Sequence, residues 1–266
     1  MAKRFYWNEL TSPEFSALDP ATTVAILPLA STEQHGPHLP VATDVAIAQG
    51  MLDTLQENIP DNLDVLVLPV QEIGKANEHI HGPGTLSFGA DLLIPAWTTI
   101  GEKVAAAGLR KIIMVNSHGG NLDIMSIVAR EMRVRFEMVA VATQWARFGT
   151  PDGMISEEER TYGIHGGEVE TSLMLHFRPE LVKMENAENF VSLAKWQKEN
   201  TRRLQPTPPN ALAWVAHDLN PKGALGNAAI ATAEKGAAIA RHQIEGFIEL
   251  VEDVIAYPLD KLYTPG

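Results

Sequence analysis

The segment LASTEQHGPHLPVATD, residues 29–44, carries Glu33, His35, His38 and Asp44 directly after an apolar run. Glu33 and His35 are separated by one residue, so in an extended segment their side chains point the same way. Imidazole and carboxylate groups without sulfur suit Zn²⁺, Mn²⁺ or Fe²⁺ as ligands. A solvent loop would also carry such charges for solubility alone, so the choice between the two interpretations depends on the rest of the chain.

Histidine also follows two further apolar runs. KIIMVN runs into SHGGN and places His118 at the end of a predicted strand, and GKANEHIHGPGTLSF (74–88) follows another run. In an open α/β sheet, ligands bind outside the carboxyl ends of the strands. Three histidine-bearing loops are therefore expected to meet at one edge of the sheet, which favours a metal hydrolase site.

A fourth cluster, GIHGGEVETSLML (163–175), contains His165, Glu168 and Glu170. The histidine lies in a glycine-containing turn, and the glutamates lie at or near a predicted helix start, where the dipole favours negative charge. Either glutamate is a candidate metal ligand or general base. Simpler roles exist for all of these residues: Asp44 as a helix N-cap, the glutamates as first-turn charges, and a lone histidine as a hydrogen-bonding residue.

The elements that must position these residues follow an α/β alternation. Four Val/Ile/Leu-rich runs predict strands buried on both faces of a parallel sheet; they span 23–29, 64–70, 111–116 and 136–144. Helical patterns lie between and after them, at 45–57, 90–107, 121–135, 167–176, about 187–200 and about 231–254. Gly108 is the expected C-cap of the second helix and Asn121 the expected N-cap of the third. The order predicts right-handed crossovers in a doubly wound sheet, with no linker that would divide the chain.

The composition excludes several classes of protein. The chain has 266 residues, of which 45% are apolar, 20% are charged and none is cysteine, so disulfides, thiolate nucleophiles and cysteine metal sites are excluded. A net charge of −12 argues against nucleic acid and anionic membranes as partners. No apolar run approaches the roughly 20 residues of a membrane helix. MAKRFYWNEL lacks the apolar region of a signal peptide, so a cytoplasmic location is expected.

Four stretches in this order resemble the creatininase family of metal-dependent amidohydrolases. They are STEQHGPHLPVATD (31–44), HIHGPGTLSF (79–88), NSHGGN (116–121) and HGGEVETSLML (165–175), with a weaker fifth, GALGNAAIATAEKG (223–236). The resemblance implies a single three-layer α/β/α domain over residues 1–266. It also implies a homo-oligomer, usually a hexamer, and two divalent metal ions, with zinc expected first and manganese or iron as alternatives.

Carried over onto this chain, the family pattern assigns Glu33, Asp44 and His118 to one metal ion. His35 and Asp44 would hold the second ion, so that Asp44 bridges the two. His165 matches the histidine near the substrate, which would stabilise the oxyanion or protonate the leaving nitrogen. His38 matches no metal ligand and is assigned to substrate or structure.

The chain departs from the family's namesake enzymes at Gly120, where those enzymes carry a glutamate that binds the second metal. Glu170 is the candidate replacement and a candidate catalytic residue. The aromatic substrate gate is not matched cleanly either, because Trp145 corresponds to one tryptophan but Thr161 and Tyr162 stand near the other. Creatinine is therefore not the expected substrate.

These observations predict a hydrolase that cleaves a C–N bond in a small, cyclic, non-peptide amide through a metal-activated water. One alternative is a related hydrolase of a formamide, a lactone or a cyclic sugar ketone. A second, from another class, is a catalytically silent binding or assembly protein. Trp196 and Trp214 are candidates for a subunit interface, although core packing is the commoner role of tryptophan.

Overall fold

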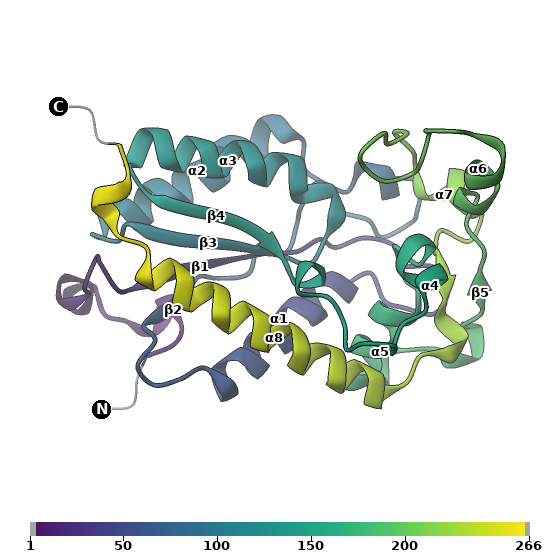
Figure 1. Cartoon of the computed structure of the whole chain (residues 1–266), viewed down its shortest axis with the longest axis horizontal. Coiled ribbons are helices and arrows are strands. Elements are labelled where there is room, and N and C mark those ends of the chain that lie inside the picture. Colours follow the sequence, from purple (N-terminus) through teal and green to yellow (C-terminus); the bar gives the residue numbers. More distant parts are fainter. Residues whose placement is uncertain (1–3, 264–266) are drawn as a thin grey trace.

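A computed structural model describes residues 4–263. Its central sheet has four parallel strands in the order β2-β1-β3-β4 (Figure 1). The strands are β1 (Val24–Leu29), β2 (Val65–Val67), β3 (Lys111–Asn116) and β4 (Val139–Gln144). The parallel sheet is confirmed, although β2 and β4 are shorter than predicted. Residues 1–3 and 264–266 lie outside the described residues. They include both ends of the domain predicted over 1–266 and the first three residues of MAKRFYWNEL.

Eight α-helices surround the sheet among the described residues (Figure 1). They are α1 (Thr43–Asn58), α2 (Ala90–Ala106), α3 (Leu122–Phe136), α4 (Glu157–Tyr162), α5 (Glu168–Phe177), α6 (Ala194–Asn200), α7 (Ala216–Leu219) and α8 (Ala233–Ala256). A small antiparallel pair, β5 (Asn189–Phe190) and β6 (Gly226–Asn227), lies beyond the strand ends. Helices α1 and α8 cover one face of the sheet and α2 and α3 the other, so the three-layer single domain is confirmed.

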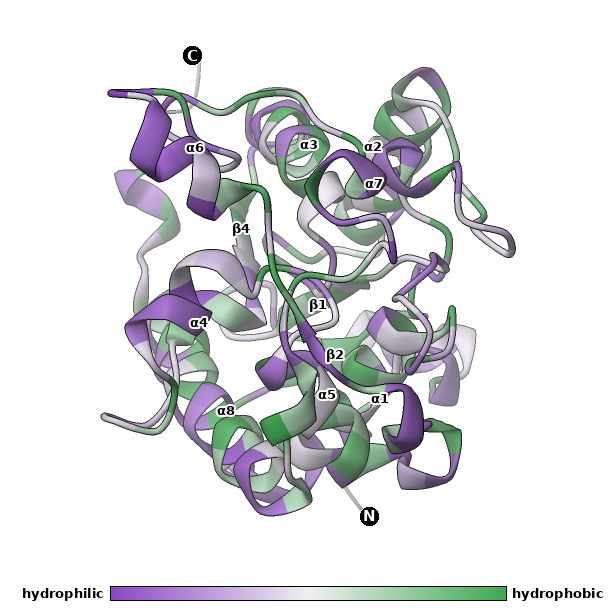
Figure 2. Cartoon of the chain, turned by 90° about the vertical axis from the view of Figure 1, so that its right-hand side faces the viewer, coloured by the Kyte–Doolittle hydropathy of each residue, from purple (hydrophilic) through white to green (hydrophobic). Residues whose placement is uncertain are grey.

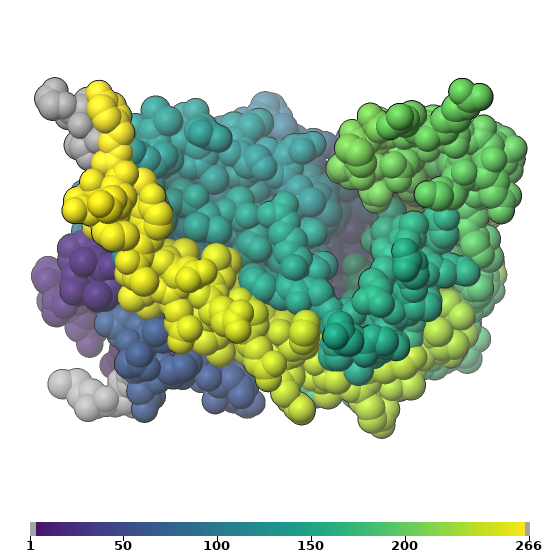
Figure 3. Space-filling model, in the orientation of Figure 1, coloured from purple at the N-terminus to yellow at the C-terminus, as the bar shows by residue number. Residues whose placement is uncertain are grey.

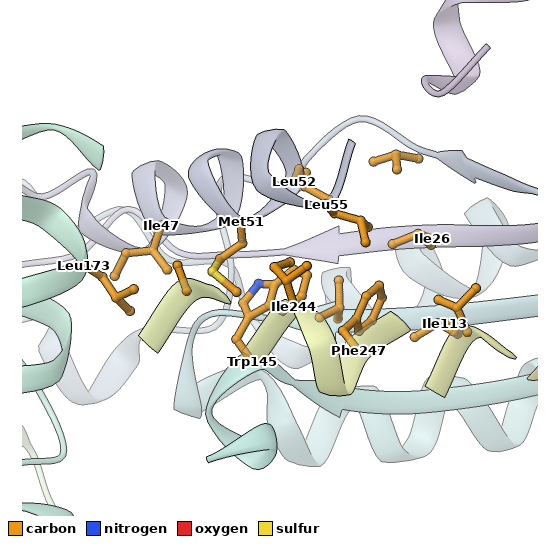
Figure 4. Packing of buried hydrophobic residues seen from close by; sticks show 14 of the residues in the cluster. Ile26, Ile47, Met51, Leu52, Leu55, Ile113, Trp145, Leu173, Ile244 and Phe247 are labelled. Carbon is orange, nitrogen blue, oxygen red and sulfur yellow. The ribbon is translucent and has the colours of Figure 1, made fainter. Parts of the chain in front are cut away.

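Strand β1 explains why the apolar runs barely alternate. Val24 and Ile26 belong to the core cluster under α1 and α8, whereas Ala25, Leu27 and Leu29 belong to the cluster under α2 and α3. All six residues of β1 are buried. Figure 4 shows the first cluster, where side chains of α1 and α8 meet those of β1 and β3. Each strand therefore needs apolar residues on both faces, as parallel sheets between helix layers do.

Several helix ends differ from the prediction. Gly108 follows α2 with φ +96°, which confirms it as the left-handed residue that ends the helix. Asn121 is the N-cap residue of α3, as predicted, but its side chain makes no capping bond, because its Oδ1 accepts from Lys75 N (2.9 Å) while its Nδ2 donates to Ala30 O (3.1 Å) and Asn116 Oδ1 (3.0 Å). Asp44 lies inside the first turn of α1, whose N-cap is Ala42. The helix predicted over 187–200 begins only at Ala194, after β5.

The carboxyl ends of the strands form the functional edge of the molecule. Figure 2 looks onto this edge, with the strands between the α1/α8 layer and the α2/α3 layer. Space-filling atoms leave a recess between the green segment around residue 200 and the teal body of the molecule (Figure 3). Within residues 4–263, none of the helices combines the length and apolar character needed to cross a membrane.

Candidate metal centre

Glu33, Asp44 and His118 meet at the carboxyl ends of β1 and β3. His118 Nδ1 lies 3.0 Å from Glu33 Oε1 and 3.4 Å from Asp44 Oδ2. All three residues are buried. The loop after β1 supplies Glu33, the first turn of α1 that follows it supplies Asp44, and the loop after β3 supplies His118. Two segments distant in sequence thus converge, as the strand-end argument predicts.

His35 approaches the same carboxylates from another side. Its Nε2 lies 3.3 Å from Asp44 Oδ1 and 3.6 Å from Glu170 Oε2. Asp44 thus directs Oδ1 toward His35 and Oδ2 toward His118, so one carboxylate faces two imidazoles from different segments. We call Glu33, His35, Asp44, His118 and Glu170 the Asp44 group.

The two glutamates at the start of α5 have different surroundings. Glu168 pairs with Lys235 of α8, and its carboxylate faces away from the Asp44 group. Glu170 Oε2 faces His35 and accepts a hydrogen bond from Gly166 N (2.6 Å). The structure therefore places Glu170, and not Glu168, beside the candidate ligands.

The imidazoles of the Asp44 group are oriented by main-chain carbonyls. His35 Nδ1 lies 3.0 Å from Glu33 O, and His118 Nε2 lies 2.9 Å from Lys75 O. Each ring thereby donates its outer N–H to a carbonyl and turns its other nitrogen toward the carboxylates. Histidines that bind metal ions use their second nitrogen in this way.

The Asp44 group lacks partners for its charge within the described chain. Glu33 Oε1 and Oε2, His35 Nε2 and Asp44 Oδ2 are buried and make no hydrogen bond of good geometry. Buried carboxylates in such numbers require a compensating positive charge. Glu33, His35 and Asp44 offer donor atoms within 4.8 Å of one another, as do His35, His165 and Glu170. His118 joins the site through its contacts with Glu33 and Asp44. Such donors, free of sulfur, fit a divalent cation of the zinc or manganese type.

The pKa values of the metal-free protein reflect the same excess of negative charge. Burial alone would lower the pKa of His35, but Asp44 and Glu170 raise it to about 10. The pKa of His118 is likewise raised, because Glu33 and Asp44 outweigh burial. Burial, with a contribution from Asp44, raises the pKa of Glu170 to about 7. Protons thus supply the positive charge that a cation would otherwise bring.

His79, His165 and Gln34 form a second, adjoining cluster that we call the Gln34 group. The His165 ring stacks between those of His35 and His79, with centroids 4.1 Å from each. His79 Nε2 lies 3.4 Å and His165 Nδ1 3.7 Å from Glu33 Oε1. Burial, with the neighbouring imidazoles, lowers the pKa values of both His79 and His165, so both rings are neutral at pH 7.

Gln34 determines which nitrogen of each ring carries the proton. Its Oε1 accepts from Gly36 N (3.0 Å) and its Nε2 donates to Gly223 O (2.8 Å). The remaining Nε2 proton faces His79 Nδ1 at 3.0 Å, so His79 is protonated at Nε2. His165 Nε2 lies 2.8 Å from Gln34 O and donates to it, which leaves its Nδ1 bare. One ring thus presents a donor to the site and the other an acceptor.

Sequence reasoning did not assign His79. The stretch HIHGPGTLSF offers two histidines two residues apart, and nothing in its pattern separates His79 from His81. In the structure His79 is buried in the Gln34 group, whereas His81 is exposed. The available signal was the position of this stretch after the second strand, which marks the loop but not the residue.

Two further residues named from the sequence lie outside the site. His38 Nε2 lies 3.0 Å from Gly166 O and 3.0 Å from Thr171 Oγ1, so this histidine ties the opening loop to α5. Trp145 is not a substrate wall, because it is buried in the core against Phe247. Trp214 does lie beside the site, with its ring centroid 6.4 Å from that of His79.

Comparison with known proteins gives a consistent result. The family model described as creatinine amidohydrolase matches residues 8–251. A mycofactocin precursor peptide peptidase of Mycobacterium ulcerans is 28% identical, over 97% of this chain and 93% of its own. The creatinine amidohydrolase of Pseudomonas putida is 27% identical, over 95% of this chain and 98% of its own. A solved manganese creatininase, 24% identical, has a TM-score of 0.75 and covers 96% of this chain and 100% of its own.

The matched region includes all the strand-end loops described above, from the segment after β1 to the start of α5. The fold and the order of the histidine-bearing segments agree with the expectation drawn from the four sequence motifs. This chain belongs to the creatininase family.

Proposed function

We propose that this protein is a divalent-metal-dependent amidohydrolase. Glu33, Asp44 and His118 would hold one ion, and His35, Asp44 and Glu170 the other. The observation that carries this proposal is the convergence of buried, unpartnered carboxylate and imidazole atoms at the carboxyl ends of the strands. Zinc is the first choice, with manganese or iron as alternatives, since the donors include no sulfur.

Bound divalent ions supply an acidified water as nucleophile and positive charge beside the substrate carbonyl. In the Gln34 group, His165 and His79 have different roles in proton transfer. His165 accepts a proton at its bare Nδ1 and returns it to the leaving nitrogen. His79 donates from Nε2–H toward the oxygen that becomes negative in the transition state. Glu170, beside His35, would help to hold the second ion.

Two classes of amide are candidates for the substrate. The sequence favours a small cyclic non-peptide amide. The resemblance to mycofactocin precursor peptide peptidases favours a peptide amide as second candidate. A cavity of about 570 Å³, lined in part by Gln34, Gly82, His217 and Lys222, adjoins the Gln34 group. This volume is in the usual range for small-ligand sites.

The test combines metal analysis with a substrate panel. Protein purified without chelator is analysed for metal and assayed against cyclic amides, imides, lactones, formamides and short peptides, before and after metal removal and reloading. We expect close to two ions per chain and turnover that depends on them. Fewer than about 0.2 ions per chain after reloading would instead support a silent binding protein. Turnover of peptides alone would select the second candidate.

Assembly and location remain proposals. Trp196 is exposed, with 56% of its surface accessible, and Val191 and Leu193 beside it are exposed as well. These residues suit a homo-oligomer interface, for which sedimentation velocity of the wild type and of Trp196→Ser is the measurement. A small-molecule substrate and a cytoplasmic location are proposed on the net charge of −12 and the site chemistry.

A further inference from the structure

Gly120 is surrounded too closely to carry a side chain. A Cβ there would come under 3.0 Å from three atoms: Glu78 Oε1, Lys75 O and His118 Nε2. Its φ is not positive, so its backbone conformation does not require glycine. The adjacent Gly119 differs, since a Cβ there would meet nothing within 4 Å. Glycine at position 120 is therefore needed for space.

Part of this space is taken by the carboxylate of Glu78. This residue lies in the short helix Asn77–His79, and its side chain is only 17% exposed. Glu78 Oε1 lies 3.4 Å from His118 Nε2, on the outer side of the ring, while His118 Nδ1 faces Glu33 and Asp44. Lys75 O completes the outer surroundings of that nitrogen at 2.9 Å.

We infer that Glu78 is a positioning residue for His118. We also infer that the missing side chain at Gly120 leaves room for the Glu78 carboxylate. The inference rests on the proposed function, since it concerns how the chain holds His118 toward a cation. A carboxylate behind a ligating imidazole fixes the ring and raises the basicity of its inner nitrogen. A Cβ at position 120 would meet both the Glu78 carboxylate and the main-chain carbonyl of Lys75, and only the carboxylate could swing away. This chain therefore has a glutamate behind His118 and no side chain at position 120.

The experiment measures the Zn²⁺ dissociation constant by competition with a chromophoric chelator. Glu78→Gln keeps the shape of the side chain and removes its charge. We expect binding about 10- to 100-fold weaker than in the wild type, the usual effect of losing such an outer partner. The exposed Glu72→Gln is the matched control and is expected to bind like the wild type. Thermal unfolding of the metal-free variants separates this effect from a loss of fold.

Two comparisons distinguish positioning from a general structural role. In a His118→Ala background, Glu78→Gln should change the dissociation constant by less than about twofold, since the two residues act as one unit. Gly120→Ala should weaken binding, whereas Gly119→Ala should not. Equal affinity of Glu78→Gln and the wild type, or additive effects in the double variant, would overturn the inference. A wild type that binds no ion would instead overturn the proposed function.

Discussion

The Asp44 group and the Gln34 group lie side by side and use the same residue type in opposite states. In the Asp44 group, carboxylates raise the pKa values of His35 and His118, so the metal-free protein holds these rings charged. In the Gln34 group, burial and neighbouring imidazoles keep His79 and His165 neutral. Neighbours, and not residue type, thus separate rings suited to face a cation from rings suited to move protons.

The largest effect is expected from Asp44→Asn, which removes the carboxylate shared by His35 and His118. Both ions should be lost, and activity should fall by about 10³-fold or more, since the ions contribute several kcal/mol to catalysis. Metal content by mass spectrometry and kcat/KM are the measurements. Asp53→Asn, on the exposed side of the same helix, is the control. Full activity with stoichiometric metal in Asp44→Asn would end the hypothesis of a metal hydrolase.

Gln34→Leu tests the role of the Gln34 group. Without the amide, His79 loses the partner that keeps its proton on Nε2, and the donor aimed at the site is no longer fixed. We expect kcat to fall about 10²-fold, as for the loss of one oxyanion donor, with metal content unchanged. Long-range proton–nitrogen NMR of the imidazoles reports the tautomer. Unchanged kcat together with a changed tautomer would show that His79 takes no part in the reaction.

Glu170→Gln tests whether Glu170, which lies beside His35, is a ligand of the second ion. The second ion should bind at least about tenfold more weakly while the first is retained, since only His35 and Asp44 then hold the second. Glu168→Gln is the matched control, because Glu168 pairs with Lys235 and should affect stability but not metal content. Two ions bound to Glu170→Gln with wild-type affinity would remove Glu170 from the ligands.

The smallest predicted effect is a pair of opposite pH dependences in the metal-free protein. The pKa of His35 is raised to about 10, so its stabilising charge is fully present below pH 6.5 and is lost as the pH rises toward 10. The lowered pKa values of His79 and His165 have the reverse effect, since their contribution is present above pH 6.5 and lost below it.

We therefore expect the free energy of unfolding of the metal-free protein to decrease by at least about 1 kcal/mol from pH 6.5 toward pH 10. Below pH 6.5 the decrease should be smaller, because protonation of Glu170, whose pKa is raised to about 7, opposes the loss from His79 and His165. Urea titrations across this range measure it. Loading with zinc should abolish the alkaline decrease, because the cation replaces the protons. A flat profile of the metal-free protein above pH 6.5 would contradict the charge states assigned to the Asp44 group.

Much of the fold was predictable because its signals are local. Apolar runs such as KIIMVN identify strands that are buried on both faces, and the end of α2 is marked by Gly108. The convergence of Glu33, His35, Asp44 and His118 was predictable as well, since parallel strands end at one edge. Asn121 does hold the predicted N-cap position of α3, but its side chain caps nothing, because its Oδ1 accepts from Lys75 N, which belongs to a distant segment.

What could not be predicted depends on contacts between distant segments. Glu168 and Glu170 differ as candidate ligands because Glu168 pairs with Lys235 of α8, a residue far away in the sequence. The role of His79 is set by Gln34, whose own orientation depends on Gly36 and Gly223. The need for glycine at position 120 comes from Lys75 O and the Glu78 carboxylate, in a segment more than 40 positions earlier in the chain. None of these pairings leaves a periodic trace in the sequence.

The cover that α8 provides for β1 has a consequence for synthesis of the chain. The ribosome makes β1 among the first residues and α8 among the last, and chains emerge from their N-termini. The cluster around Val24 and Ile26 therefore stays incompletely covered until residues 233–256 have been released, because α1 supplies one part of its cover and Ile244 and Phe247 of α8 another. Nascent chains stalled before residue 233 should aggregate or recruit chaperones, although every proposed metal ligand has already been made.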